Sequence, residues 1–199
     1  MSESPAKATP EMAVRERLLA VATEIFAQKG YTATKVREIV AAARVTKPAL
    51  YYYFQNKEGI YLELMREGLA KLDDLLDTSR VEKGEVSDKI LALCDRLLVL
   101  LAENMQLAKV IYAVHYGPPQ GSPSFDCNVF HLKFREAVQD LIKEGITRGE
   151  FRGNDALDMA WAVLGAVNIA IEVELCHPEL SLGREGLVRV LRLIFEGLR

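Results

Sequence analysis

The sequence lacks most features of secreted, disulfide-stapled or membrane proteins. It has three cysteines in 199 residues, an odd number spaced far apart, which make no disulfide framework and fit a reducing cytoplasm. Residues 1–10 are polar and contain no apolar stretch, so they predict a disordered tail and not a secretion signal. No window of about 18 residues is apolar and uncharged, which argues against a transmembrane span. We therefore expect a cytoplasmic protein.

Catalytic signatures are also missing. The chain contains no glycine-rich phosphate loop, no nucleophile elbow and no paired histidine and acid motif on a strand, so we do not expect an enzyme. Cys127 and His131 have an i, i+4 spacing that can bind zinc, but two ligands do not make a site, and we expect no metal and no cofactor. Cys94 lies on an apolar helical face, which leaves Cys127, near a loop, as the expected redox-active thiol.

Apolar residues recur with a period of 3.6 along the whole chain, and no stretch alternates as a strand would. This pattern predicts an all-α protein of about nine helices. The capping residues we expect are Thr34, Thr46, Asn56 and Asn154 at helix N-termini and a left-handed Gly30 at a C-terminus. The expected helices cover residues 11–29, 35–43, 47–54, 57–78, 86–101, 103–116, 124–148, 155–176 and 183–199.

The net charge of −3 at first argues against a nucleic-acid partner, but the charge is unevenly distributed. Residues 1–58 carry nine Lys or Arg and six Asp or Glu, whereas residues 59–199 carry sixteen and twenty-two. A mildly basic N-terminal part on an acidic body suggests two parts with different partners.

Residues 34–57 predict two short helices separated by a tight turn at Arg44 and Val45, which is a helix-turn-helix. The second of these helices is rich in side chains suited to DNA. Lysines can neutralise phosphates, tyrosines offer hydroxyls and flat rings, and a small residue can meet a thymine methyl group. Outside such an arrangement, tyrosines at helical spacing are more often core residues, and lysines are usually just solvated. The DNA-facing candidates are Lys47, Ala49, Tyr51, Tyr52, Tyr53 and Lys57, while Leu50 and Phe54 on the opposite face anchor the helix.

The run Val45–Glu58, read as VTKPALYYYFQNKE, resembles the signature of TetR-type transcriptional regulators, and so does the upstream run Ile25–Thr34. The motif similarity covers about residues 13–65. The resemblance implies a homodimeric, all-helical, ligand-responsive protein that usually represses transcription. The sequence departs from the family at Arg44, where Gly is usual; in a left-handed conformation Arg costs about 1 kcal/mol there.

The resemblance also implies a division of the chain and a set of DNA contacts. After the disordered tail at 1–10 come a helix-turn-helix DNA-binding domain at 11–56 and a ligand-binding and dimerisation domain of helices at 57–199. Residues 57–78 form the linker helix. The implied partners are phosphate for Thr34, Lys35, Tyr52 and Lys57, a base or phosphate for Arg37, Thr46, Lys47 and Tyr51, and a base for Pro48 and Ala49.

The last two expected helices have wider apolar surfaces than one core needs. Between Met159 and Ile171 only Asn168 is polar, and a helix that is apolar all round must be covered on more than one side. This pattern favours a dimer interface, and the alternative is that both helices are central in a monomer. The expected interface residues are Leu164, Ile171, Leu187, Leu191, Ile194 and Phe195.

A ligand cavity inside the C-terminal bundle is implied by the same resemblance. Apolar walls with few polar groups are typical of small-molecule pockets and favour a mainly apolar effector. Two of the candidates, Phe130 and Phe134, have an i, i+4 spacing that is more often found in ordinary core residues. The candidate lining residues are Met65, Leu69, Tyr112, His115, Tyr116, Phe130, Phe134, Trp161 and Asn168.

Together these observations predict a sequence-specific DNA-binding transcriptional regulator. We expect a repressor that leaves its operator DNA when a small, mainly apolar effector binds the C-terminal bundle. The alternative is a helical protein-interaction adaptor that does not bind DNA and has no salt-dependent DNA affinity.

Overall fold

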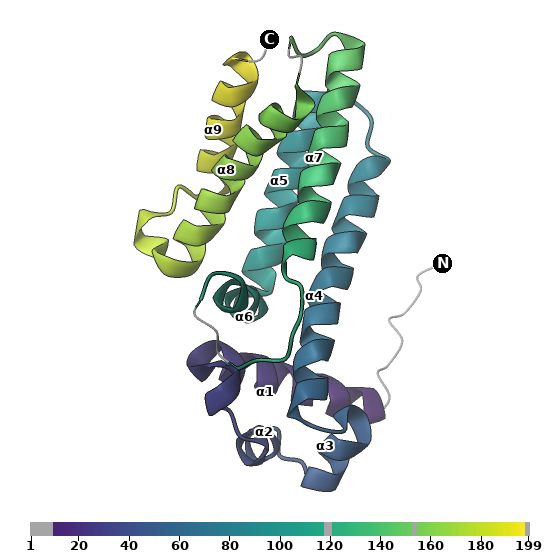
Figure 1. Ribbon diagram of the computed structural model, residues 1–199, viewed down its shortest axis with the longest axis vertical. Coiled ribbons are helices and arrows are strands. Elements are labelled where there is room, and N and C mark those ends of the chain that lie inside the picture. Colours follow the sequence, from purple (N-terminus) through teal and green to yellow (C-terminus); the bar gives the residue numbers. More distant parts are fainter. Residues whose placement is uncertain (1–9, 118–120, 153–154, 198–199) are drawn as a thin grey trace, which may run out of the picture. The chain divides into compact units, whose positions relative to one another are not determined.

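The computed structural model of the chain describes residues 10–117, 121–152 and 155–197. The predicted tail at 1–10 lies outside the described residues except for Pro10, which begins the first helix. Within the described ranges the chain forms nine α-helices and one 3₁₀ turn and contains no strand, which confirms the all-α prediction (Figure 1). The helices are α1 (Pro10–Ala33), α2 (Val36–Ala42), α3 (Lys47–Phe54), α4 (Lys57–Arg80), α5 (Val86–Glu103), α6 (Met105–Tyr116), α7 (Asn128–Arg148), α8 (Ala156–Cys176) and α9 (Gly183–Gly197), with the 3₁₀ turn at Pro178–Leu180.

The chain divides into two compact units. The first unit extends to Gly68 and includes Lys109–Phe125, and the second contains Leu69–Ala108 and Asp126–Arg199. This grouping differs from the predicted domains 11–56 and 57–199 in two respects. The first turns of α4 belong with the N-terminal helices, and so does the C-terminal half of α6.

Local capping groups set the helix ends of the first unit much as the sequence predicts. Gly30 has φ 77° and ψ 170°, a backbone conformation that favours glycine, so it interrupts α1 instead of forming the predicted left-handed C-cap. The Thr46 hydroxyl accepts the Ala49 N–H at the start of α3, and the Asn56 side chain accepts the Gly59 N–H at the start of α4.

Two predicted caps are wrong or lie outside the described residues. Lys35, not Thr34, is the N-cap of α2, and Glu38 accepts the Lys35 N–H at 2.8 Å. The Thr34 hydroxyl instead donates to Gly30 O, four residues back. At the start of α8 the cap is Asp155, whose carboxylate accepts the Leu157 and Asp158 N–H groups; Asn154 is outside the described residues.

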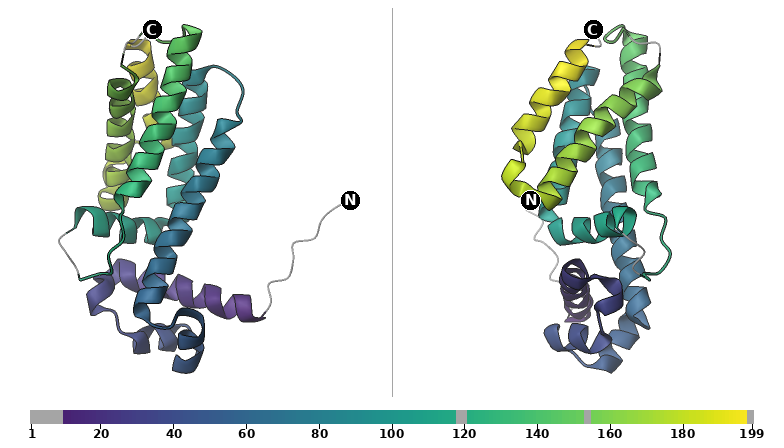
Figure 2. Two further views of the ribbon diagram at one scale, coloured as in Figure 1. Left: turned by 45° about the vertical axis from the view of Figure 1, so that its right-hand side comes forward. Right: turned by 60° about the vertical axis from the view of Figure 1, so that its left-hand side comes forward.

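The second unit packs α5, α7, α8 and α9 side by side around one hydrophobic core (Figure 2). The core exists because each of these helices covers its apolar stripe against two of the others. Its fully or nearly fully buried side chains include Ile90, Cys94, Val138, Ile142, Ala160, Val163 and Leu191.

The core changes the predicted dimer interface. Leu164, Leu187, Leu191 and Phe195 are at most 3% exposed and pack inside a single chain, so they cannot form a surface that a second copy covers. Ile171 and Ile194 are half-buried against the same core. The exposed apolar side chains of α8 and α9 are instead Trp161, Ile169 and Leu193, with exposed fractions of 55%, 57% and 68%.

The apolar character of α8 is therefore only partly used within one chain. Its mean hydropathy reaches 1.6 over an 18-residue window, and 28% of that window is buried. By length and composition α8 is the one single helix among the described residues that could cross a membrane, but core helices of soluble proteins can have the same length and composition.

The three cysteines occupy different environments. Burial raises the pKa of the Cys94 thiol to about 12, and burial also raises the pKa of Cys127 above its usual value. Cys176 at the end of α8 is exposed. The expectation that Cys127 is the reactive thiol is therefore wrong, since a reactive thiol needs access and thiolate character.

Candidate DNA-binding site

The helix-turn-helix formed by α2 and α3 is anchored by apolar side chains on its inner face. Ile39 and Leu50 are completely buried, and Phe54 is 6% exposed. Arg15 of α1 approaches the Phe54 ring at 5.7 Å and pairs with Glu63 and Glu67 of α4. Leu50 and Phe54 bury one face of α3 in the domain. The opposite, outer face is therefore available to another molecule.

The turn between α2 and α3 depends on a left-handed Arg44, with φ 54°. The Arg44 N–H donates to Ala41 O at 3.2 Å, and the Val45 N–H donates to Val40 O at 3.0 Å. This pair of bonds is a Schellman motif, which satisfies the last carbonyls of a helix and normally has Gly at the left-handed position. Arg44, which replaces the family's usual Gly, therefore stands at a left-handed position where any side chain is strained.

The outer face of α3 presents aromatic and basic groups. Tyr52 is 74% exposed and Tyr51 is 46% exposed, and the Tyr52 and Tyr53 rings meet edge to face at 5.0 Å. Thr46, Lys47 and Pro48 are exposed at the start of the helix, and Ala49 is half-buried. Hydroxyls, flat rings and a cation on one short helix are the groups that contact phosphates and base edges.

Several cations around α2 and α3 are available for phosphate. Lys35, Arg37, Arg44 and Lys47 are all exposed, and none of them forms an ion pair with another of the described residues. Lys29, by contrast, pairs with Glu38 at 2.7 Å. Unpaired cations on the same short segment provide the positive surface that DNA requires.

Two predicted phosphate ligands lie in different surroundings. Thr34 is 2% exposed, and its hydroxyl is already bonded to Gly30 O. The Lys57 Nζ atom donates to Tyr31 O at 2.8 Å and to Thr34 O at 2.9 Å, and it lies 4.0 Å from the centre of the Tyr31 ring. Neither side chain is free to meet a phosphate in this conformation.

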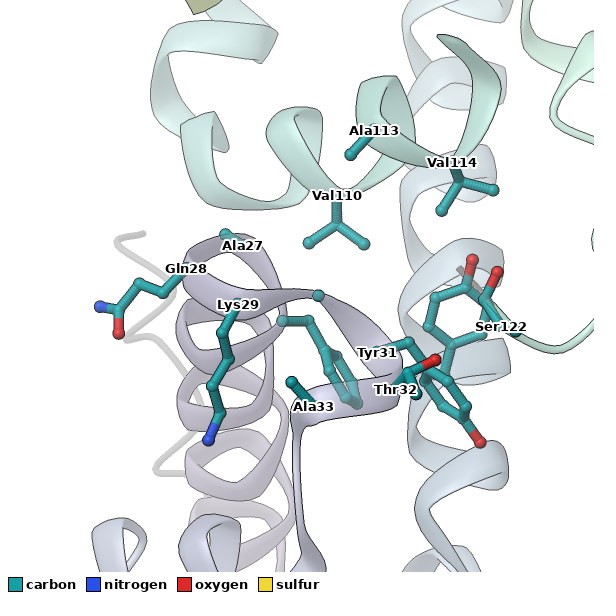
Figure 3. Close-up of a pocket in the computed structure, with 14 residues that line it drawn as sticks. Ala27, Gln28, Lys29, Tyr31, Thr32, Ala33, Val110, Ala113, Val114 and Ser122 are labelled. Atoms are coloured by element: carbon teal, nitrogen blue, oxygen red, sulfur yellow. The ribbon is translucent and has the colours of Figure 1, made fainter. Parts of the chain in front are cut away.

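A pocket of about 790 Å³ lies within the first unit, between the end of α1 and the C-terminal half of α6 (Figure 3). Figure 3 shows Val110, Ala113 and Val114 of α6 above the turn that carries Tyr31 and Thr32. Its wall is completed by Gly121 and Ser122. The i, i+3, i+4 spacing of the three small α6 residues is a helical-face signal in the sequence, but nothing in the sequence pairs that face with α1.

None of the nine predicted effector residues lines this pocket. Met65, Tyr112, His115 and Tyr116 belong to the first unit, whereas Leu69, Phe130, Phe134, Trp161 and Asn168 belong to the second. In the first unit the Tyr112 and Tyr116 rings lie 4.6 Å apart, and the rings of His115 and Tyr116 lie 4.4 Å apart. Met65 is completely buried, Phe134 belongs to the core of the second unit, and Trp161 and Tyr116 are more than half exposed.

Metal-binding groups are sparse in the part of the chain that the structure describes. No set of three or more His, Cys, Asp or Glu side chains there is close enough to hold a metal ion.

The fold and the exposed face of α3 define a helix-turn-helix DNA-binding protein. The family model described as bacterial regulatory proteins of the tetR family matches residues 18–64, which include the whole helix-turn-helix. Residues 18–64 are thus similar to the DNA-binding region of tetR-family transcriptional regulators.

Relatives extend this likeness along the chain. The HTH-type transcriptional regulator YdgC of Bacillus subtilis is 34% identical over 100 residues, which are 48% of this chain and 51% of that protein. The HTH-type transcriptional regulator QacR of Staphylococcus aureus is 28% identical over 160 residues, 79% of this chain and 84% of QacR. The crystal structure of the transcriptional regulator FadR of Bacillus subtilis in complex with stearoyl-CoA has the same fold, with a TM-score of 0.70, 19% identity, and coverage of 92% of this chain and 99% of that one.

Proposed function

We propose that the protein is a homodimeric repressor that binds operator DNA through α2 and α3 and leaves it when a small, mainly apolar effector binds. The observation that carries the proposal is the outer face of α3, where Lys47, Tyr51 and Tyr52 are exposed opposite the buried anchors Leu50 and Phe54. A free-standing interaction helix would not need this division into two faces.

The DNA contacts that we propose follow the exposure of each side chain. Tyr51, with Pro48 and Ala49 beside it, faces base edges in the major groove, and Tyr52 binds phosphate through its hydroxyl. Lys35 and Lys47 neutralise phosphates, and Arg37 and Thr46 contact a phosphate or a base. The side chain of Thr34 is buried, so its backbone, and not its hydroxyl, contributes to the DNA-binding surface.

The dimer forms through the outer faces of α8 and α9. Trp161, Gly165 and Ile169 follow one another at i, i+4 and i+8 along α8 and are all exposed. Leu193 of α9 is 68% exposed. A second copy covering this face would remove the apolar surface that a single chain leaves in water. In such a dimer two recognition helices about 34–36 Å apart reach successive major grooves.

The effector binds in the C-terminal bundle, at a site that includes part of the predicted aromatic set. FadR, which shares the fold, was solved in complex with stearoyl-CoA, a ligand with an apolar acyl chain. The helix α4 runs from Lys57 in the first unit to Arg80 in the second, so it is a continuous connection between ligand-binding and DNA-binding parts. A ligand that binds more tightly to a second orientation of α4, one that does not fit DNA, shifts the protein toward that orientation. The loss of DNA affinity is set by the difference between the ligand's affinities for the two orientations.

The test is fluorescence anisotropy with DNA from beside the gene for this protein, against scrambled DNA, at two salt concentrations. Selective, salt-sensitive binding supports the regulator, and it supplies a displacement assay for effectors. The matched variants are Lys47→Gln and Lys83→Gln; Lys83 is equally exposed but lies in the loop between α4 and α5.

A regulator requires that only the Lys47 variant loses affinity. Absence of salt-dependent binding to any DNA, including DNA selected from a random pool, would contradict the proposal and favour the adaptor.

A further inference from the structure

The ammonium group of Lys57 is held by the last turn of α1 and by Thr34, which follows it. Its Nζ atom donates to Tyr31 O at 2.8 Å and to Thr34 O at 2.9 Å. The same ammonium lies 4.0 Å from the centre of the Tyr31 ring, a cation–π distance. All of these atoms belong to the first unit, so the contacts lie within one compact body.

The two carbonyls lie where α1 ends, and Lys57 adds a donor to each of them. Gly30 interrupts α1, residues 31–33 form its last turn, and Thr34 and Lys35 lead from that turn into α2. Within this turn the Thr34 N–H donates to Tyr31 O at 3.1 Å, and α2 begins its own bonds at Lys35 O. A lysine from the next long helix supplies a second donor to Tyr31 O, and it supplies a donor to Thr34 O, which would otherwise depend on water.

The aromatic surroundings hold the lysine in a fixed place. The Tyr31 ring meets the Tyr61 ring edge to face at 5.1 Å and lies 5.7 Å from the Phe26 ring. Tyr61 and Phe26 are buried, at 0% and 3% exposure. Burial lowers the pKa of Lys57 below its usual value. The ammonium is therefore partly removed from water before any DNA arrives.

We propose that Lys57 is a positioning residue: it fixes the turn at Tyr31–Thr34, and with it the start of α2, on the first turn of α4, instead of binding phosphate. The inference rests on the proposed DNA-binding function, and it replaces the phosphate contact that the family resemblance implied for Lys57. A phosphate could recruit this ammonium only by breaking two hydrogen bonds and a cation–π contact, whereas the exposed Lys47 makes no ion pair with a described residue.

The first part of the test needs no DNA. In the free wild-type protein, the Lys57 ammonium is expected to give a ¹⁵N-correlated NMR signal protected from solvent exchange, assigned by its loss in Lys57→Arg. Lys57→Met is expected to lower the unfolding midpoint by several degrees, since α2 loses its attachment. Lys47→Met, the matched control, is expected to leave that midpoint unchanged.

The second part separates positioning from phosphate binding. DNA selected from a random pool by the wild type is titrated at four salt concentrations, well below the unfolding midpoint of every variant. The slope of log affinity against log salt is negative, and each lost phosphate contact makes it shallower by about 0.9. We expect that loss for Lys47→Met. For Lys57→Met we expect an unchanged slope and a ratio of selected to scrambled DNA affinity reduced at least tenfold.

The opposite results would overturn the inference. One is a Lys57 ammonium that exchanges rapidly with solvent. The other is a Lys57→Met variant with the wild-type unfolding midpoint and a salt slope of DNA binding that is shallower by about 0.9. If Lys57→Met does not fold, Lys57→Arg replaces it in the titration: an unchanged slope with reduced selectivity supports positioning, and wild-type selectivity contradicts it. A wild-type protein that binds no DNA would refute the proposed function but leave the NMR and unfolding results to decide the role of Lys57.

Discussion

Gly145 of α7 lies directly against the ring of Phe151. A Cβ atom at position 145 would fall 2.4 Å from Phe151 Cδ2 and 2.6 Å from Cε2. The Gly145 carbonyl also accepts the Glu150 N–H at 2.9 Å, which folds the chain back after the left-handed Gly149. Phe151 in turn stacks on Phe195 of α9 at 5.7 Å. The missing side chain at 145 thus lets the α7–α8 loop close onto the core.

Gly145→Ala is expected to destabilise the protein by about 1–3 kcal/mol, because a buried ring must move to accept the new methyl group. Urea unfolding measures the change. Phe151→Leu is the control, since a smaller side chain leaves room for the methyl group. The double variant should be more stable than the sum of the two single effects predicts; strict additivity would contradict the proposed clash.

Arg44→Gly is expected to stabilise the protein by about 1 kcal/mol, because it relieves a left-handed residue in the Schellman motif. Arg44→Ala removes the charge but keeps a Cβ atom, so it should give no gain. Thermal unfolding of both variants against the wild type decides between strain and charge. An equal gain for both would assign the effect to the charge of Arg44.

Ile169→Asp is expected to convert the proposed dimer to monomers, raising its dissociation constant about 100-fold or more, since a carboxylate would be buried in an apolar interface. Val81→Asp is the matched control, because Val81 is 78% exposed and lies outside α8 and α9. Sedimentation velocity over a range of concentrations measures both. A dimer that survives Ile169→Asp would mean that another face joins the two copies.

Tyr51→Ala is expected to weaken binding to the selected operator by about 1–3 kcal/mol and to relax selectivity, as loss of a base contact does. Tyr116→Ala provides the comparison, since Tyr116 is similarly exposed but lies on α6. Anisotropy titrations without effector should leave the Tyr116 variant at wild-type affinity. Equal losses in the two variants would remove Tyr51 from the interface.

Acid should weaken the second unit through Glu144. The buried Lys89 ammonium, 2.9 Å from the Glu144 carboxylate, holds the pKa of that carboxyl below its usual 4.5. A lowered folded-state pKa contributes stability above pH 4.5 that is lost as the pH falls through the folded value. Lys89→Met should therefore cost about 1–2 kcal/mol at pH 7 and progressively less as the pH falls below the usual carboxyl pKa.

Urea unfolding between pH 7 and pH 3 measures that difference. Lys143→Met removes an exposed ion pair with Asp140 and should cost at most about 0.5 kcal/mol. A cost for Lys89→Met that does not change with pH would assign the effect to packing and not to the ion pair.

Local chemistry explains why the helix-turn-helix could be predicted from the sequence. The Thr46 and Asn56 caps and the Gly30 break depend on residues at most four positions apart, so they are visible as short patterns. The special position of Arg44 is visible for the same reason, because its bonds reach only to Ala41 and, through Val45, to Val40.

Long-range pairing explains what the sequence could not predict. The helix α8 is apolar nearly all round, so its period does not tell which side meets its own core and which is left exposed; Leu164 and Trp161 illustrate the two outcomes. The bonds of Lys57 reach residues 23 and 26 positions earlier. A lysine at the start of a helix has the same sequence signature whether it meets a phosphate or a carbonyl.

The unequal environments of the three thiols make the native chain suitable for single-site labelling. Cys94 is buried with a pKa of about 12, Cys127 is buried, and Cys176 is exposed at the end of α8. A maleimide dye or nitroxide at neutral pH should therefore attach at Cys176 alone, without removal of the other cysteines. Each protomer would carry one reporter beside the proposed dimer face, so one distance distribution would describe subunit pairing in solution.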